Sequence, residues 1–278
     1  MPDTTKYRAL LATVLEEKGL TLHGLTPFAP LEDHLLPCRA ASRLPEKPCA
    51  AVMILFPYRF PEQGQRNLSR YACVPDYHEA AGTVLEHTAR RLGQEFPGFS
   101  FVPFIDNSPL PEVEAAARAG LGVIGDNGLL IHPLYGSYVF IGEIVTDLPL
   151  DPVGREPEGC LHCGRCARAC PGDCLISPGG DRTHCLSALS QKKGELTPQE
   201  ERLLLEGGLV WGCDRCQEVC PLNAETRCAP HPCFGGRYRP VLTREDLEDL
   251  EGKAYGWRGR KVPERNLRLF EEGNHVSQ

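Results

Sequence analysis

The stretch CLHCGRCARACP, residues 160–171, carries four cysteines in the pattern C-x2-C-x2-C-x3-C-P. This pattern is typical of bacterial ferredoxins, in which three closely spaced cysteines bind one 4Fe–4S cluster and the fourth binds its neighbour. A structural zinc site usually shows two separate pairs of cysteines instead. A disulfide framework is not expected, because the first residues resemble no export signal and cytosolic thiols stay reduced. The stretch therefore predicts half of a two-cluster iron–sulfur domain.

A second run, CDRCQEVCP at 213–221, repeats the last three cysteines and the proline of the first run. The position that would hold its first cysteine is Val210, so one ligand must come from elsewhere. We expect Cys185 to supply it, with Cys174 as the next candidate. By the crossed ligation of such domains, one cluster binds Cys160, Cys163, Cys166 and Cys220, and the other binds Cys170, Cys185, Cys213 and Cys216.

The six remaining cysteines are interpreted as small buried hydrophobic residues. Two of them, Cys228 and Cys233, are further alternatives for the displaced cluster ligand. The six are Cys38, Cys49, Cys73, Cys174, Cys228 and Cys233.

Composition predicts a soluble globular protein of one large or two smaller domains. The chain has 278 residues, of which 41% are hydrophobic, and a formal net charge of −7. That charge argues against a surface that coats nucleic acid generally, although a local basic patch is compatible with it. The longest apolar run, CAAVMILF at 49–56, is too short to span a membrane. We therefore expect a cytoplasmic protein without a membrane partner, and the N-terminal segment is expected to be an amphipathic helix.

The first 150 residues alternate between apolar runs and helical patterns. Three runs predict buried strands, at 49–56, 100–106 and 137–147, and residues 75–96 show helical periodicity. The Pro- and Gly-rich segment 151–159 is interpreted as the joint to the cluster domain.

A further helix is predicted after the second strand. Its expected start has Ser108 as N-cap and Pro109 at the first helical position, and its expected end is Gly120. The motif GLGVIG at 120–125 fits the dinucleotide-binding fingerprint, but that fingerprint needs a strand before it and a helix after it. Here a helix precedes and a loop leading into a strand follows, so no Rossmann site is expected. We expect the glycines to let the backbone pass close to a bulky neighbour.

Taken together, several motifs resemble the epoxyqueuosine reductases, which are cobalamin-dependent iron–sulfur enzymes of tRNA queuosine synthesis. The resemblance extends from about Cys49 to Leu269, and reductive dehalogenases share the general layout. Besides the two cysteine runs, it rests on DYHE (76–79), FIDNSPLPEVEAAARAGLGVIGDNGLLI (104–131), YGSYVFIGEIVTD (135–147) and GWRGRKVPERN (256–266).

The resemblance implies an α+β fold, with a nitroreductase-like cobalamin-binding domain followed by a bacterial-ferredoxin-like double-cubane domain. The implied boundaries are 1–150 for the catalytic domain, 151–235 for the cluster domain and 236–278 for a basic C-terminal tail. It also implies two 4Fe–4S clusters, base-off cobalamin reduced by the nearer cluster, and reduction of an epoxide to an alkene with loss of water. The implied partners are a queuosine-type tRNA and an external electron donor such as ferredoxin or flavodoxin.

The resemblance assigns the role of general acid to Asp106. Partial desolvation beside a flat cofactor would raise the pKa of this carboxyl group, and the alternative is that Asp106 only caps the following helix. His78 is interpreted as a helix-start histidine that is satisfied by hydrogen bonds, rather than as a cobalt ligand. Seven positions correspond to cofactor-facing residues, although local loop hydrogen bonds would explain them too: Ser69, Asn127, His132, Gly136, Ser137, Glu143 and Ser187.

The sequence also departs from the family pattern. Asp126 stands where a lysine is usual, Val123 stands where an aromatic residue is common, and the helical repeats that help to hold tRNA are not expected after the WRG segment. Residues 253–268 carry six cations against Glu264, so this segment is predicted to contact tRNA phosphates unless its arginines pair with acids such as Glu248. Two other hypotheses are a same-fold cobalamin reductase that acts on a small molecule and a plain ferredoxin-like electron carrier.

Overall fold

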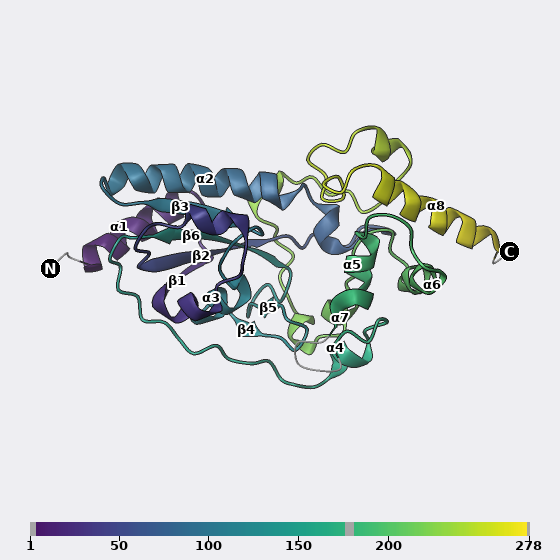
Figure 1. The fold of residues 1–278 in the computed structure, drawn as a ribbon, viewed down its shortest axis with the longest axis horizontal. Coiled ribbons are helices and arrows are strands. Elements are labelled where there is room, and N and C mark those ends of the chain that lie inside the picture. Colours follow the sequence, from purple (N-terminus) through teal and green to yellow (C-terminus); the bar gives the residue numbers. More distant parts are fainter. Residues whose placement is uncertain (1–3, 176–180, 277–278) are drawn as a thin grey trace. The chain divides into compact units, whose positions relative to one another are not determined.

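A computed structural model describes residues 4–175 and 181–276 and divides the chain into two compact units (Figure 1). The first unit comprises the chain up to Pro57 together with 78–160, and the second comprises 58–77 together with the chain from Leu161 onward. This division differs from the predicted boundaries, because the segment 58–77 belongs with the cluster region. The backbone of Asn67 bonds to Val210 and Pro240, and Ser69 N–H donates to the Trp211 carbonyl at 2.8 Å.

The first unit is built on an antiparallel four-stranded sheet with the order β1-β2-β6-β3. The central strand β2 is buried along its whole length, as its apolar sequence predicts. The strands are β1 (His23–Pro27), β2 (Ala50–Pro57), β3 (Phe101–Ile105) and β6 (Val139–Thr146). A second sheet of two strands pairs β4 (Val123–Ile124) with β5 (Leu130–Ile131).

Helices cover both faces of the larger sheet (Figure 1). The helix α2 (Tyr77–Glu95) packs on one face, where Leu85 lies so close to Gly142 that a side chain there would collide with it. The alanines of α3 (Glu112–Arg118) pack on the other face, against residues of β2 such as Met53. The first unit also contains α1 (Thr4–Glu17) and two 3-10 helices, η1 (Ala29–His34) and η2 (Arg39–Arg43).

Most elements predicted for the first 150 residues are confirmed. The strands β2, β3 and β6 and the helices α1 and α2 lie where the sequence predicts them. The start of α3 was predicted wrongly. Pro111 is its N-cap residue and Glu112 is its first residue, because the Ser108 hydroxyl donates across to Glu143 on β6 and accepts from Leu110 N–H. At the other end, Gly120 follows the C-cap residue with φ +79°.

The glycine motif 120–125 has no dinucleotide-binding geometry. Its last residues form β4, which pairs with β5 instead of leading into a helix. A Cβ atom on Gly122 would lie 2.5 Å from the Ile131 carbonyl oxygen. Glycine is therefore required because two backbone segments approach each other closely, and the neighbour is the strand β5.

The second unit consists of short helices joined by turns. The helices α4 and α7, one from each cysteine run, contact each other. The core of this unit centres on Trp211 and Tyr255, and the buried Asn266 donates to the Ser190 and Val210 carbonyls at 2.8 Å each. The elements are η3 (Arg70–Cys73), α4 (Arg165–Arg168), η4 (Arg182–His184), α5 (Leu186–Ser190), α6 (Pro198–Gly207), α7 (Arg215–Glu218), η5 (Pro221–Asn223), η6 (Pro232–Phe234), η7 (Glu245–Glu248) and α8 (Lys261–Val276).

The mixed content of helices and antiparallel strands confirms the predicted α+β class. Across residues 4–175 and 181–276, no helix is long and apolar enough to cross a membrane. Of the six cysteines outside the predicted cluster sets, Cys73 and Cys174 are buried as expected. The expectation is wrong for Cys49 and Cys228, which are exposed, and only partly met for the half-buried Cys38 and Cys233.

Candidate functional site

Three cysteine thiols predicted to bind the same cluster lie close together in the second unit. The pKa of the Cys213 thiol is raised to about 11, chiefly by burial, with smaller contributions from Asp214 and from the nearby thiols of Cys185 and Cys170. The Cys170 sulfur also accepts a hydrogen bond from the backbone N–H of Cys174 at 3.4 Å. Backbone N–H groups aimed at cysteine sulfurs are the hydrogen bonds that stabilise thiolate ligands of iron–sulfur clusters. The donor set therefore fits a cluster that includes Cys185.

The alternative ligand, Cys174, has a different environment. Its side chain is only 3% exposed, and its thiol donates to the Gly172 carbonyl at 3.4 Å. Burial raises the pKa of this thiol to about 12, and its neighbours Cys170 and Cys185 add to the shift. Cys174 is therefore held beside the sulfur of Cys170 by its own backbone.

Four of the remaining predicted cluster ligands lie around α4 and α7. Cys166 and Cys216 lie within these helices, and Cys163 and Cys220 lie at their edges. Cys160 lies at the end of the first unit, where its backbone N–H donates to Ile124 on β4 at 3.0 Å. The sulfur of Cys160 accepts from the backbone N–H of Asp126 at 3.4 Å. Asp126, which stands where the family usually has lysine, is therefore hydrogen-bonded through its backbone to a predicted cluster ligand.

A buried acid fixes the loop that carries Cys213 and Cys216. Asp214 is 1% exposed, and it accepts from Arg66 Nη1 at 2.7 Å and from Arg70 N–H at 2.9 Å. Burial raises the pKa of Asp214, and the Arg66 guanidinium opposes that rise. This pair was not predicted from the sequence. The sequence shows only that a charged residue, Asp214, stands inside a cysteine motif. Its partner arginines are almost 150 positions away, so local patterns do not connect them.

Asp106 lies on the loop that follows β3 and has a backbone φ of +57°, which is unusual for a residue other than glycine. Its side chain is 60% exposed, and Oδ2 lies 3.1 Å from Nε2 of His78, the second residue of α2. The chain itself therefore does not desolvate this carboxyl group. The helix-cap alternative is wrong, because α3 begins only at Glu112. The hydrogen-bonded interpretation of His78 is confirmed.

Two further carboxyl groups lie behind Asp106, those of the fully buried Glu143 and the half-buried Glu112. Glu143 is fully buried on β6, in register with Met53 and Phe104, and it accepts a hydrogen bond from the Ser108 hydroxyl. Glu112, the first residue of α3, accepts from the backbone N–H of Asp106. Burial raises the pKa of both glutamates, and the negative charges of Glu143 and Asp106 raise that of Glu112 further.

Glu112 was not predicted as a site residue. Acidic residues in the first turn of a helix are common because they favour the helix dipole, so its sequence context gave no separate signal. Only the fold brings it together with Glu143 and Asp106.

The loop before β6 holds four of the predicted cofactor-facing residues. Asn127 is buried, and its Oδ1 accepts from Leu129 N–H at 3.3 Å. His132 Nδ1 accepts from Leu134 N–H at 3.1 Å, and burial lowers the pKa of this imidazole. The backbones of His132 and Gly136 bond to each other in both directions, and Ser137 is buried next to them. The loop therefore presents a set of preorganised polar groups.

The other two predicted cofactor-facing residues lie in the second unit. Ser187 interacts with the hydroxyl of Tyr71, whose pKa burial raises to about 12, and among the described residues the nearby Ser69 Oγ is buried without a hydrogen-bond partner. Gly212 packs directly against Ser69, and a Cβ atom at that position would collide with its hydroxyl. The structure thus brings the predicted residues together as two groups, one within each unit.

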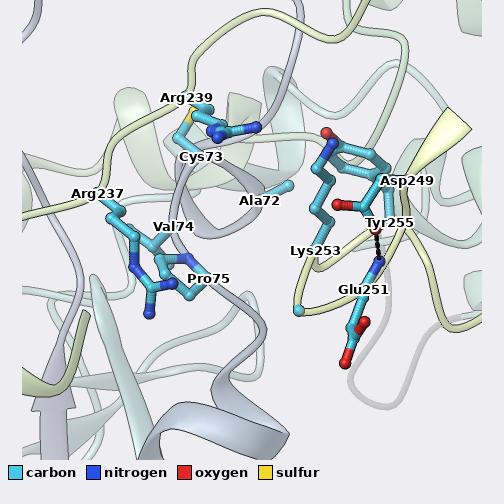
Figure 2. A pocket seen from close by; sticks show the side chains of 11 residues that line it. Ala72, Cys73, Val74, Pro75, Arg237, Arg239, Asp249, Glu251, Lys253 and Tyr255 are labelled. Carbon is cyan, nitrogen blue, oxygen red and sulfur yellow. Dashed lines mark hydrogen bonds between the residues drawn. The ribbon is translucent and has the colours of Figure 1, made fainter. Parts of the chain in front are cut away.

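The second unit also contains a pocket of about 200 Å³ with charged walls (Figure 2). Arg237 and Arg239 lie on one side, and Asp249, Glu251 and Lys253 lie on the other. Two of these cations pair with Asp246, which does not line the pocket. Its Oδ1 lies 3.2 Å from Lys253 Nζ and 3.7 Å from Arg239 Nη1. The walls of the pocket therefore carry positive and negative side chains in nearly equal numbers.

The cations of segment 253–268 divide into partnered and exposed groups. Arg260 lies 3.1 Å from Glu248, as the alternative interpretation predicted, and Arg258 stacks over Trp257. Arg265 donates to the carbonyl groups of Lys192 and Gly194. The exposed members on α8 are Lys261 and Arg268.

Comparison with known proteins relates this chain to a family of iron–sulfur enzymes. Residues 159–223 match the model of a 4Fe-4S double cluster binding domain, which confirms the predicted two-cluster domain. An epoxyqueuosine reductase from Lactococcus garvieae is 30% identical over 96% of this chain and 80% of its own length. Those of Gloeobacter violaceus and Escherichia coli are 40% and 33% identical, and the chain spans 63% and 48% of their lengths.

Solved structures agree with these sequence matches. A crystal structure of epoxyqueuosine reductase with a tRNA-Tyr stem loop carrying epoxyqueuosine is 25% identical and superimposes with a TM-score of 0.81. The match covers 96% of this chain and 81% of that one. A Bacillus subtilis epoxyqueuosine reductase, whose catalytic aspartate loop is swung out of the active site, gives a TM-score of 0.80 at 25% identity, with 96% and 82% covered.

Proposed function

The chain belongs to the epoxyqueuosine reductase family, and from this premise we propose that it reduces the epoxide of epoxyqueuosine in tRNA to the alkene of queuosine. The observation that carries the proposal is the carboxyl group of Asp106. It lies on an exposed loop with a left-handed backbone, hydrogen-bonded to His78 and backed by the buried Glu143 and the half-buried Glu112. A proton donor in that position is what the opening of an epoxide requires. The chain is accordingly an oxidoreductase.

The electrons for this reaction come through the cofactors. Residues 159–223 form the double 4Fe–4S domain, and we assign its ligands as the two crossed sets of cysteines given above. Cobalamin, when bound, supplies the electrons that break the carbon–oxygen bonds. An external donor such as ferredoxin or flavodoxin would recharge the clusters.

The residues proposed to hold cobalamin are those of the two polar groups. In the first unit the loop with Asn127, His132 and Ser137 fits such a role, because local hydrogen bonds fix the Asn127 amide and the His132 ring, and Ser137 is buried beside them. In the second unit the candidates are Ser69 and Ser187. Gly136 would shape the loop, since its φ of +59° favours glycine. Glu143 would support the Asp106 loop through Ser108, because its side chain is fully enclosed.

The tRNA would be bound in part by α8. Lys261 and Arg268 are exposed on this helix and are not committed to the ion pairs that hold Arg260. Exposed cations of this kind neutralise phosphates and make binding sensitive to salt. The structure of a relative with an epoxyqueuosine stem loop supports the same substrate class.

The test of the proposed function is the substitution Asp106→Asn. Asparagine tolerates the left-handed backbone and keeps a hydrogen-bonding side chain, but it cannot donate the proton. We expect turnover of epoxyqueuosine stem loop to fall by roughly 10²- to 10⁴-fold, while iron content and bound cobalamin stay unchanged.

The matched control is Asp151→Asn. Asp151 is also an exposed aspartate with positive φ, +44°, but it lies in the joint that follows β6. This variant should turn over at the wild-type rate. Wild-type turnover by the Asp106 variant would remove the acid role and, with it, the observation on which the proposal rests.

A further inference from the structure

Three carboxyl groups and one histidine surround the loop between β3 and α3. Asp106 is exposed, whereas Glu143 is fully buried and Glu112 is half-buried. Among the residues that the structure describes, Glu112 Oε1 and Glu143 Oε2 are buried without a hydrogen-bond partner. A buried ionised oxygen without a partner is costly, so the arrangement favours a proton on this pair. The proposed reaction has a use for such a proton.

Reducing an epoxide to an alkene consumes two electrons and two protons and releases one water molecule. The first proton neutralises the oxygen when the ring opens, and the second allows that oxygen to leave as water when the second carbon–oxygen bond breaks. Asp106 holds one exchangeable proton. A second acid must therefore supply the other, or Asp106 must be reprotonated within the same turnover.

The surroundings of the two glutamates distinguish their roles. The Ser108 hydroxyl donates to Glu143, which stabilises a negative charge on that residue. Glu112 faces the carboxylates of Glu143 and Asp106, which oppose its ionised form more strongly than the Asp106 backbone N–H and His78 favour it. When the pair holds a single proton, Glu112 is therefore its more stable location.

We propose that Glu112 is the proton reserve of this site, which returns a proton to Asp106 after Asp106 has protonated the substrate. This inference rests on the proposed epoxide reduction. The contact between Glu112 and the backbone N–H of Asp106 places the first residue of α3 against the loop that carries Asp106. The proton finally reaches the former epoxide oxygen of the substrate, which leaves as water. The proton transfer from Glu112 through Asp106 therefore ends in a stable product. Glu112 acts through Asp106 and is a positioning and relay residue rather than a group that touches the substrate.

The test uses Glu112→Gln in the full chain with its cofactors bound. Glutamine keeps the size of the side chain and an oxygen that can accept from Asp106 N–H, but it has no proton to release. We expect kcat to fall by roughly 10- to 100-fold, less than for Asp106→Asn because Asp106 is exposed to solvent and can be reprotonated slowly. KM for the stem loop should stay unchanged, and raising the concentration of imidazole buffer at constant pH should restore much of the rate.

The matched control is Glu114→Gln, on the same helix. Glu114 bonds to Arg118 and His34 instead of Asp106, so this variant should keep the wild-type rate and gain nothing from buffer. In a background that already carries Asp106→Asn, Glu112→Gln should cost nothing further. An unchanged kcat, a loss that buffer does not rescue, or an additional loss in the double variant would overturn the proposal.

A second measurement separates this inference from the proposed function. Infrared spectroscopy of the protein near neutral pH should show a protonated carboxyl band that weakens in Glu112→Gln and is unchanged in Glu114→Gln. Absence of that band in the wild type would refute the reserve even if epoxyqueuosine is reduced. If the wild type shows the band but reduces no epoxyqueuosine, the proposed function fails, and with it the relay that rests on it.

Discussion

Replacing Cys185 should remove one of the two clusters and leave the other intact. Each cubane needs four thiolate ligands, so protein reconstituted without oxygen should hold about eight irons and the Cys185→Ser variant about four. The structural reason is that Cys185 and Cys170 lie near enough to Cys213 for their charges to act on its thiol. Iron and sulfide analysis with the visible cluster absorbance measures the loss directly.

The control is Cys174→Ser, the alternative ligand a few residues away. Its thiol is buried against the Gly172 carbonyl, and its backbone N–H, which serine keeps, bonds to the Cys170 sulfur. This variant should keep about eight irons. If Cys174→Ser loses half of the iron and Cys185→Ser loses none, the assignment of the fourth ligand is wrong, and the second cluster is held from the turn after α4.

Three further predictions concern the stability of the first unit and the tRNA surface. Gly122→Ala should lower the free energy of unfolding by about 1–3 kcal/mol, because its Cβ would collide with the β5 backbone. The control Gly93→Ala on α2 meets open space and should not lower it. Chemical unfolding of both variants measures the difference. The folded-state pKa of Glu143 is raised, so its contribution to stability is present at acidic pH and is lost as pH rises through that raised value. The Tm of Glu143→Gln should therefore depend less on pH than the wild-type Tm between about pH 5 and pH 9, and parallel profiles would contradict the shift. Replacing Lys261 and Arg268 with glutamine should weaken stem-loop binding and lower the slope of its salt dependence by about one for each phosphate that is no longer neutralised. Unaltered binding in a filter or fluorescence assay would exclude α8 from the interface.

The cluster domain and the sheet could be predicted from local patterns. Cysteine spacing encodes the two-cluster domain because ligation within one run depends on neighbours in sequence. The apolar run of β2 identified the central strand for a similar reason, since burial on both faces leaves no polar position. The predicted start of α3 failed because Ser108 bonds to Glu143, a contact over 35 positions that outweighs the local preference for capping.

The candidate site could be predicted only in part. Asp106 came from a motif, but its pairing with His78 and the two glutamates behind it depend on how β3, α2, α3 and β6 pack. The Arg66–Asp214 pair and the membership of 58–77 in the second unit are likewise long-range features. Desolvation was expected at Asp106, yet within the chain it falls on Glu112 and Glu143. The buried carboxyl groups are therefore the part of the site that sequence reasoning could not locate.

The central claim is tested most directly by incubating the protein, loaded with both clusters and cobalamin, with a reductant and an epoxyqueuosine stem loop under anaerobic conditions. Mass spectrometry of the digested RNA should show queuosine, lighter than the starting nucleoside by one oxygen atom, in amounts that exceed the enzyme and only when cobalamin is present. Epoxyqueuosine that remains unconverted by fully loaded protein, with the same stem loop converted by a known family member in parallel, would contradict the account.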